Sequence, residues 1–126
     1  MIQVYKRLKK MREKYVDTLA KLYEYATTVY SKRIYTQWYD TKEGSYTFAS
    51  FKSECDALSK KLTQYGIGSG DKVAILSQSM PNWSVAFFAT VAYGRISIPI
   101  LPDSSENEVT NIINHSESKV IFVSKR

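Results

Sequence analysis

Apolar residues near the start of the chain recur at helical spacing. Over residues 3–30 they follow one another at steps of three and four, and neither glycine nor proline interrupts them. The pattern predicts a helix across residues 3–30, with a break between its basic start and the remainder near residues 15–17. The residues on this stripe are Leu8, Met11, Tyr15, Leu19, Leu22, Ala26 and Val29.

Residues 33–48 change to a strand-forming composition. Ile34-Tyr35-Thr36, Trp38-Tyr39 and Tyr46-Thr47 are β-branched or aromatic residues of the kind enriched in strands. The segment from Asp40 to Gly44 separates them and has turn composition, with Gly44 able to adopt a positive φ. These features predict a β-hairpin.

A further helix is predicted over residues 48–65. Thr47 can act as its N-cap, because the hydroxyl accepts a hydrogen bond from a free first-turn amide. Gly66 follows at a position that favours the left-handed conformation. The apolar stripe of this helix consists of Phe48, Phe51, Cys55, Leu58 and Leu62.

After residue 71 the chain alternates strands with helices. Pro81 opens a helix whose nearly all-round apolar surface predicts burial, and Pro99 marks a strand end or a sheet edge. Consecutive strands joined by helices imply right-handed crossovers and a parallel sheet. The apolar runs predict buried strands over residues 72–77, 96–101 and 120–123, and helices over 81–93 and 105–115.

The predicted fold class is therefore α/β. An N-terminal helix and β-hairpin are followed by helix-strand-helix-strand-helix-strand, with a mostly parallel sheet. Because three strands make an incomplete sheet, an exposed sheet face is expected to drive self-association.

The net charge of +6 is concentrated at the start of the chain. Glu13 is the one acid among the first fourteen residues, so residues 1–15 are expected to form a basic helical leader ahead of a domain over residues 16–126. A solvated helix is favoured for this leader, and weak contact with an anionic membrane surface stays open. The basic residues are Lys6, Arg7, Lys9, Lys10, Arg12 and Lys14.

The remaining composition is that of an ordinary globular domain. The chain carries no apolar run near the roughly 20 residues that span a bilayer and no secretory signal pattern, so a cytoplasmic location is predicted. Trp38, Tyr39, Tyr23 and Tyr30 could stack on nucleic-acid bases, but packing is the favoured interpretation, and no nucleic-acid partner is expected.

Three features invite a chemical interpretation, and each is better explained structurally. Gly66-Ile67-Gly68-Ser69-Gly70 lacks the G-x-G-x-x-G spacing and follows a helix, whereas phosphate loops follow a strand. Cys55 is the one cysteine and lies on an apolar helical stripe, which favours burial. His115, the one histidine, lies at a predicted helix end, where a surface role is favoured.

Four stretches, taken together and in order, resemble the start of the AMP-forming acyl-CoA synthetases. That superfamily includes firefly luciferase and peptide-synthetase adenylation domains. Three local departures from its pattern are Ser50 in place of a capping acid, Met80 in place of serine, and Ala92-Tyr93-Gly94-Arg95 in place of Ala-Gly-Ala. They are expected to be local capping or packing changes. The four stretches are Tyr46-Thr47-Phe48 with Phe51, residues 62–75 (LTQYGIGSGDKVAI), Met80 to Pro99, and Ser105 to Val123.

The resemblance implies a parent enzyme that joins a carboxylate to AMP from ATP, with Mg²⁺, and then transfers the acyl group to coenzyme A. The style of the sequence is most similar to the long- and medium-chain fatty-acid branch. The family's phosphate loop, Thr-Glu motif, ribose-binding Asp, hinge and C-terminal Lys have no counterpart in this chain, so no catalytic, cofactor-binding or metal-binding residue is assigned. Residues 16–126 are interpreted as part of the N-terminal subdomain, inactive alone, whose partner is the remainder of the parent chain.

Two alternatives stay open. A free-standing basic α/β module could bind nucleic acid or acidic lipid without catalysis, and its binding would weaken steeply with salt. Within the family, an adenylation domain for an amino acid or an aryl acid is the other alternative.

Overall fold

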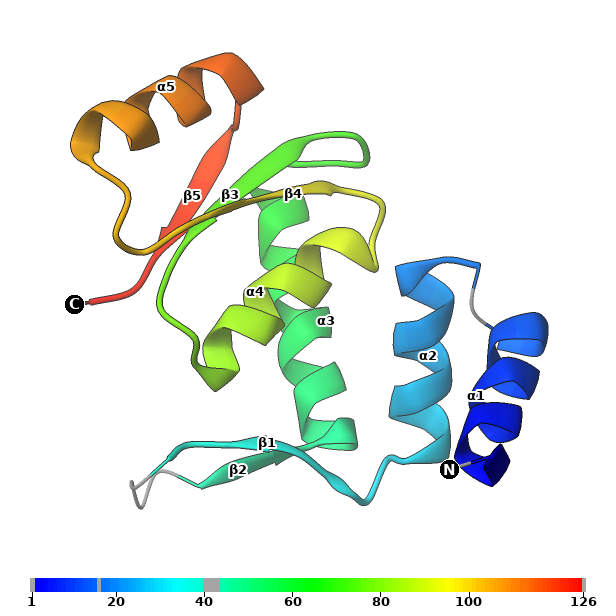
Figure 1. Cartoon of the computed structure of the whole chain (residues 1–126). Helices are drawn as coiled ribbons and strands as arrows, with labels where there is room; N and C mark the ends of the chain where they lie inside the picture. The colour runs from blue at the N-terminus through cyan, green and yellow to red at the C-terminus, as the bar shows by residue number, and fades with distance from the viewer. Residues whose placement is uncertain (1, 16, 40–43, 126) are drawn as a thin grey trace.

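Two helices, not one, form the N-terminal region. The computed structural model describes residues 2–15, 17–39 and 44–125, with α1 (Ile2–Tyr15) and α2 (Leu19–Val29) packed side by side (Figure 1). The predicted helical stretch over residues 3–30 is therefore divided after Tyr15, where its break was expected. Thr18 starts the second helix, because its backbone is extended and its hydroxyl accepts from the Lys21 amide at 3.2 Å.

The predicted β-hairpin is confirmed. β1 (Ile34–Gln37) pairs antiparallel with β2 (Ser45–Thr47), and Gly44 has φ +92°. The predicted turn residues 40–43 lie outside the described residues. Tyr39, which was expected to extend the first strand, lies beyond its end and is 95% exposed.

The hairpin leads directly into α3 (Phe48–Gln64) through a capping box. The Thr47 hydroxyl accepts from the Ser50 amide at 3.1 Å, and the Ser50 hydroxyl accepts from the Thr47 amide at 2.9 Å. Ser50 thus forms the capping-box hydrogen bond that an acidic residue forms at this position in the family pattern. Gly66, with φ +78°, follows the helix as predicted, and the Ile67 amide closes the turn on the Leu62 carbonyl at 3.0 Å.

The predicted parallel sheet is also confirmed. Its order is β4-β3-β5, and both pairings are parallel. Pro99 lies in β4, at one edge of the sheet, as expected. Helices α3 and α4 lie on one side of the sheet and α5 on the other (Figure 1). The elements are β3 (Lys72–Leu76), α4 (Pro81–Val91), β4 (Ile96–Ile100), α5 (Glu106–Ser116) and β5 (Val120–Val123).

Burial of the three strands differs from the prediction. In β3, Val73, Ala74 and Ile75 are at most 1% exposed, but in β5 Ile121 is 37% and Val123 63% exposed. β4 and β5 are edge strands, and α5 contains no buried residue, so this side of the sheet is thinly covered. The prediction that all three strands are buried is therefore wrong for the two edge strands.

The core consists of two apolar clusters. The first joins α2, α3 and α4 through Tyr23, Phe51 and Val85, and the rings of Tyr35 and Phe88 pack against it. The second lies between α3 and the sheet and contains Leu62, Ile67 and Val73, with Val120 and Phe122 packed against it. The helices and the sheet therefore form one packed unit, and the expected packing role of Tyr23 is confirmed.

Arg95 is a buried cation that the sequence did not reveal. It is 6% exposed, and its guanidinium donates to the Ile67 carbonyl at 3.0 Å, to the Ser59 hydroxyl at 2.9 Å and carbonyl at 3.1 Å, and to Thr63 Oγ1 at 2.8 Å. A longer bond reaches the Ala89 carbonyl at 3.3 Å. Among the described residues no carboxylate forms a salt bridge with it. The departure from the family pattern at Arg95 therefore links α3, α4 and the loop after α3, which is more than a local change.

Candidate functional site

The carboxyl ends of β3 and β5 lie side by side and are tied together. Ser77 and Ser124 directly follow these two strands. The Ser124 amide donates to the Leu76 carbonyl at 3.2 Å, and the Gln78 amide donates to the Ser124 hydroxyl at 3.3 Å. In open parallel sheets ligands bind at the carboxyl ends of the strands, so this end of the sheet is the expected position of a binding site.

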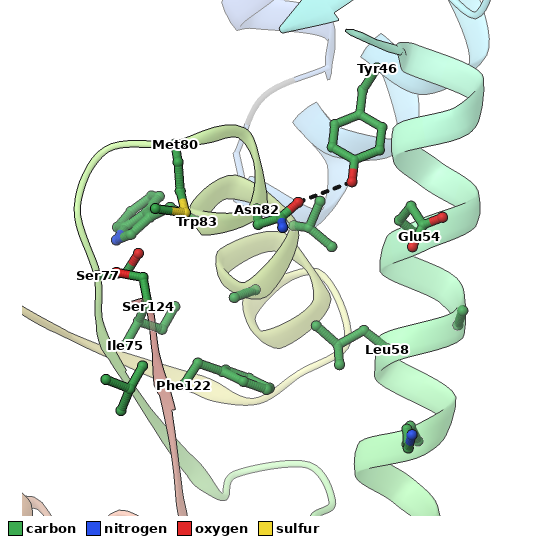
Figure 2. A pocket seen from close by; sticks show the side chains of 15 residues that line it. Tyr46, Glu54, Leu58, Ile75, Ser77, Met80, Asn82, Trp83, Phe122 and Ser124 are labelled. Carbon is green, nitrogen blue, oxygen red and sulfur yellow. Dashed lines mark hydrogen bonds between the residues drawn. The ribbon is translucent and has the colours of Figure 1, made fainter. Parts of the chain in front are cut away.

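A hollow of about 530 Å³ opens at this end of the sheet (Figure 2). Its floor is apolar and comes from the sheet and from α3 and α4, whereas its rim carries polar groups. Tyr46 closes one side by donating to the Asn82 side chain at 3.0 Å, and Glu54 projects from α3. The apolar lining residues are Ala57, Leu58, Ile75, Met80, Trp83, Val85, Ala86, Phe122 and Val123.

The start of α4 borders this hollow and lacks a side-chain cap. Met80 occupies the N-cap position with extended backbone and forms no capping hydrogen bond, while Pro81 follows at the first helical position. A serine here, as the family pattern has, could accept from a first-turn amide. The departure at Met80 therefore exchanges a capping hydrogen bond for apolar surface in the hollow.

Among its described lining residues, the hollow has one acidic side chain, Glu54, and one basic side chain, Lys61. Burial, followed by the nearby Glu54 carboxylate, raises the pKa of Tyr46. Glu54 is the only carboxylate among the described lining residues, and no described residues gather into a cluster of three or more His, Cys, Asp or Glu that could hold a metal. One carboxylate and one lysine, Lys61, are fewer charged groups than usually surround the phosphates of a magnesium nucleotide, so no nucleotide site is assigned to the hollow.

Neither Cys55 nor His115 is among the residues that line this hollow. Cys55 is completely buried on the apolar side of α3, with its thiol 3.7 Å from the Val85 carbonyl, as the sequence predicts. His115 is exposed in the last turn of α5, also as predicted. Because they lie on different helices and one is buried while the other is exposed, the structure does not bring them together as a nucleophile and base.

The glycine-rich segment 66–70 lies at the amino end of β3, which is the opposite end from the hollow. The Gly68 amide donates to the Asp71 carboxylate at 2.8 Å, and Asp71 also pairs with Lys119 at 2.7 Å, just before β5. Lys119 is the largest influence that lowers the pKa of Asp71. These bonds tie the starts of two strands together, so the interpretation as a structural turn is confirmed.

A hydrogen-bonded pair of tyrosines adjoins Cys55. The Tyr23 and Tyr93 hydroxyls are 3.4 Å apart, and Tyr93 also donates to the Asp56 carboxylate. Burial raises the pKa of the Cys55 thiol to about 12. Burial, together with the bond to Asp56, raises the pKa of Tyr93 to about 12, and burial raises the pKa of Tyr23 further.

We expect this cluster to make the fold sensitive to alkali. Cys55, Tyr23 and Tyr93 are all neutral in the fold, whereas in the unfolded chain they ionise near their ordinary pKa values. Their contribution to stability is complete below about pH 8.5 and is lost as the pH rises toward 12. Urea unfolding should therefore give a lower free energy at about pH 10.5 than at about pH 7.5. Cys55→Ala should narrow that difference, and equal stability of the wild-type chain at both pH values would contradict the account.

Comparison with known proteins gives a family. A family model described as "AMP-binding enzyme" matches residues 23–126, which is most of the chain. The chain belongs to this family of AMP-binding enzymes. The match begins in α2 and includes both the hairpin and the whole parallel sheet, so the resemblance seen in the sequence is confirmed.

The similar proteins agree on the fold. The long-chain-fatty-acid–CoA ligase FadD15 of Mycobacterium bovis is 30% identical over 94 residues, which cover 75% of this chain and 15% of the ligase. A fatty acyl CoA synthetase structure from Mycobacterium tuberculosis superimposes with a TM-score of 0.75 at 24% identity, over 84% of this chain and 21% of that one. The structure of the Klebsiella oxytoca NpsA N-terminal subdomain, in complex with 3-hydroxyanthranilyl-AMSN, superimposes with a TM-score of 0.76 at 16% identity. The match covers 87% of this chain and 28% of that one.

The sequence of this AMP-binding family member corresponds to only part of the length of its relatives. It spans 11% to 20% of the length of the curated relatives it matches. Its architecture is that of the N-terminal subdomain of adenylate-forming enzymes. In the described part of the chain, no helix is both long and apolar enough to cross a membrane.

Sequence reasoning missed two features of this family member. The hollow was not foreseen, although serines directly after two apolar strands and Trp83 after Pro81 were visible in the sequence. Arg95 was noted only as a departure from the pattern. A lone arginine directly before an apolar strand gives no sign in the sequence of which carbonyl groups will surround it.

Proposed function

We propose that this chain is the N-terminal scaffold portion of an ATP-dependent acyl-CoA synthetase. The complete enzyme would first join a carboxylate to AMP and then form a thioester with coenzyme A. The family match over residues 23–126 is the single observation that carries this proposal. ATP, Mg²⁺ and coenzyme A are the cofactors proposed for the complete enzyme, and a cytoplasmic location is proposed with them.

We propose a fatty acid as the substrate. Relatives of about 30% identity include the medium-chain fatty-acid–CoA ligase of Escherichia coli and the long chain acyl-CoA synthetase 2 of Arabidopsis thaliana. The second candidate is an aryl or amino acid. It is favoured by the NpsA subdomain structures, whose bound molecules are named as anthranilyl and benzoyl derivatives. Those structures are about 16% identical and support the fold alone, so the fatty acid is preferred.

The role proposed for this chain is to support the catalytic parts and not to react. Trp83, Phe122 and Leu58 give the hollow an apolar floor, and its polar rim has neither a nucleophile with a base nor a set of cationic donors among the described residues. Rate enhancement at a phosphoryl centre depends on such placed groups. The chain alone is therefore expected to be inactive.

The test of this role uses the isolated chain 1–126 with ATP, Mg²⁺, coenzyme A and hexadecanoic acid. We expect neither AMP nor pyrophosphate above the enzyme-free background. The full-length product of the gene, assayed beside it with hexadecanoic acid, 3-hydroxybenzoic acid and phenylalanine, should form a CoA thioester with the fatty acid. Turnover by the isolated chain would contradict the scaffold role, and a preference for either of the other acids would contradict the substrate.

The proposed partner of this chain is the remainder of the enzyme, placed against β5 and the adjoining hollow. β5 pairs with β3 on one side only among the described strands, and its Ile121 and Val123 are exposed. A strand edge of this kind is a template for pairing with another strand.

We therefore expect the isolated chain to self-associate as its concentration rises. Val123→Lys should shift the mass measured by light scattering toward the monomer, because a lysine on an edge strand opposes pairing. Tyr65→Lys is the matched control, since Tyr65 is 72% exposed at the end of α3 and does not belong to β5. A strictly monomeric wild-type chain at high concentration, or an equal effect of the two lysines, would contradict the expectation.

A further inference from the structure

We draw no further inference here: the strongest candidate, the apolar hollow between α3, α4 and the carboxyl ends of β3 and β5, belongs to the site already described, and nothing in the described part of the structure shows what covers it.

Discussion

Replacing Arg95 with methionine should lower the free energy of unfolding by about 3 kcal/mol. Methionine keeps an unbranched, flexible apolar side chain, although a shorter one, and removes every donor. The carbonyl groups of Ser59 and Ile67 and the hydroxyl of Thr63 would then lose buried hydrogen bonds from a charged group. Each orphaned buried acceptor costs about 1–3 kcal/mol, partly offset because the guanidinium no longer has to be taken out of water.

Urea unfolding monitored by circular dichroism measures this effect. Arg33→Met is the matched control, because Arg33 is exposed and lies over the Tyr30 ring at 5.1 Å, a contact that contributes about 0.5–1 kcal/mol. The free energy of unfolding of Arg95→Lys should lie between those of the wild-type chain and Arg95→Met. Lysine keeps the charge but cannot reach the acceptors of three segments at once. The free energy of unfolding of Arg95→Met could instead lie within about 0.5 kcal/mol of the wild-type value. The cost of burying the guanidinium would then equal the stabilisation from its hydrogen bonds, and the stabilising role of Arg95 would be refuted.

Replacing Phe51 with alanine should lower the free energy of unfolding by about 3–5 kcal/mol. Phe51 is 2% exposed, and its ring contacts those of Tyr35 at 4.3 Å, Phe88 at 5.8 Å and Tyr23 at 6.0 Å between centroids. The substitution removes apolar contacts with the hairpin, with α4 and with α2 together. It also leaves a cavity, because the three elements packed around the ring cannot close fully over its place.

Phe51→Leu should retain most of that stability, because leucine fills much of the same volume. Tyr39→Ala is the surface control, since Tyr39 is 95% exposed and its truncation should change the free energy of unfolding by less than about 0.5 kcal/mol. The same urea titration reports all three variants. A loss at Phe51→Ala no greater than at Tyr39→Ala would mean that the aromatic cluster does not hold the hairpin and the helices together.

Local signals in the sequence were sufficient for the elements and their order. Thr47 and Gly66 marked the two ends of α3, Pro81 marked the start of α4, and the apolar runs marked the strands. Each of these residues acts through its own backbone or its nearest neighbours. The alternation of strands and helices then left a parallel sheet as the natural arrangement, and the structure has it.

Features that depend on distant contacts could not be predicted in the same way. An apolar run such as Val120–Val123 does not state whether both faces will be covered, and the exposure of Val123 follows from the edge position of β5 and from the thin cover of α5. Arg95 finds its acceptors on a helix about thirty residues earlier, so its burial is a property of the packed structure. The hollow likewise exists only where α3, α4 and the sheet meet.

The most direct test of the central claim is the exchange of labelled pyrophosphate into ATP by the full-length gene product, measured with and without a carboxylic acid substrate. That exchange reports the reversible formation of an acyl-adenylate, which is the step that defines the proposed enzyme. With Mg²⁺ and hexadecanoic acid, we expect exchange well above that seen without a carboxylic acid. Exchange that no acid of the fatty, aryl or amino classes stimulates would contradict the assignment of this chain to a carboxylate-activating enzyme.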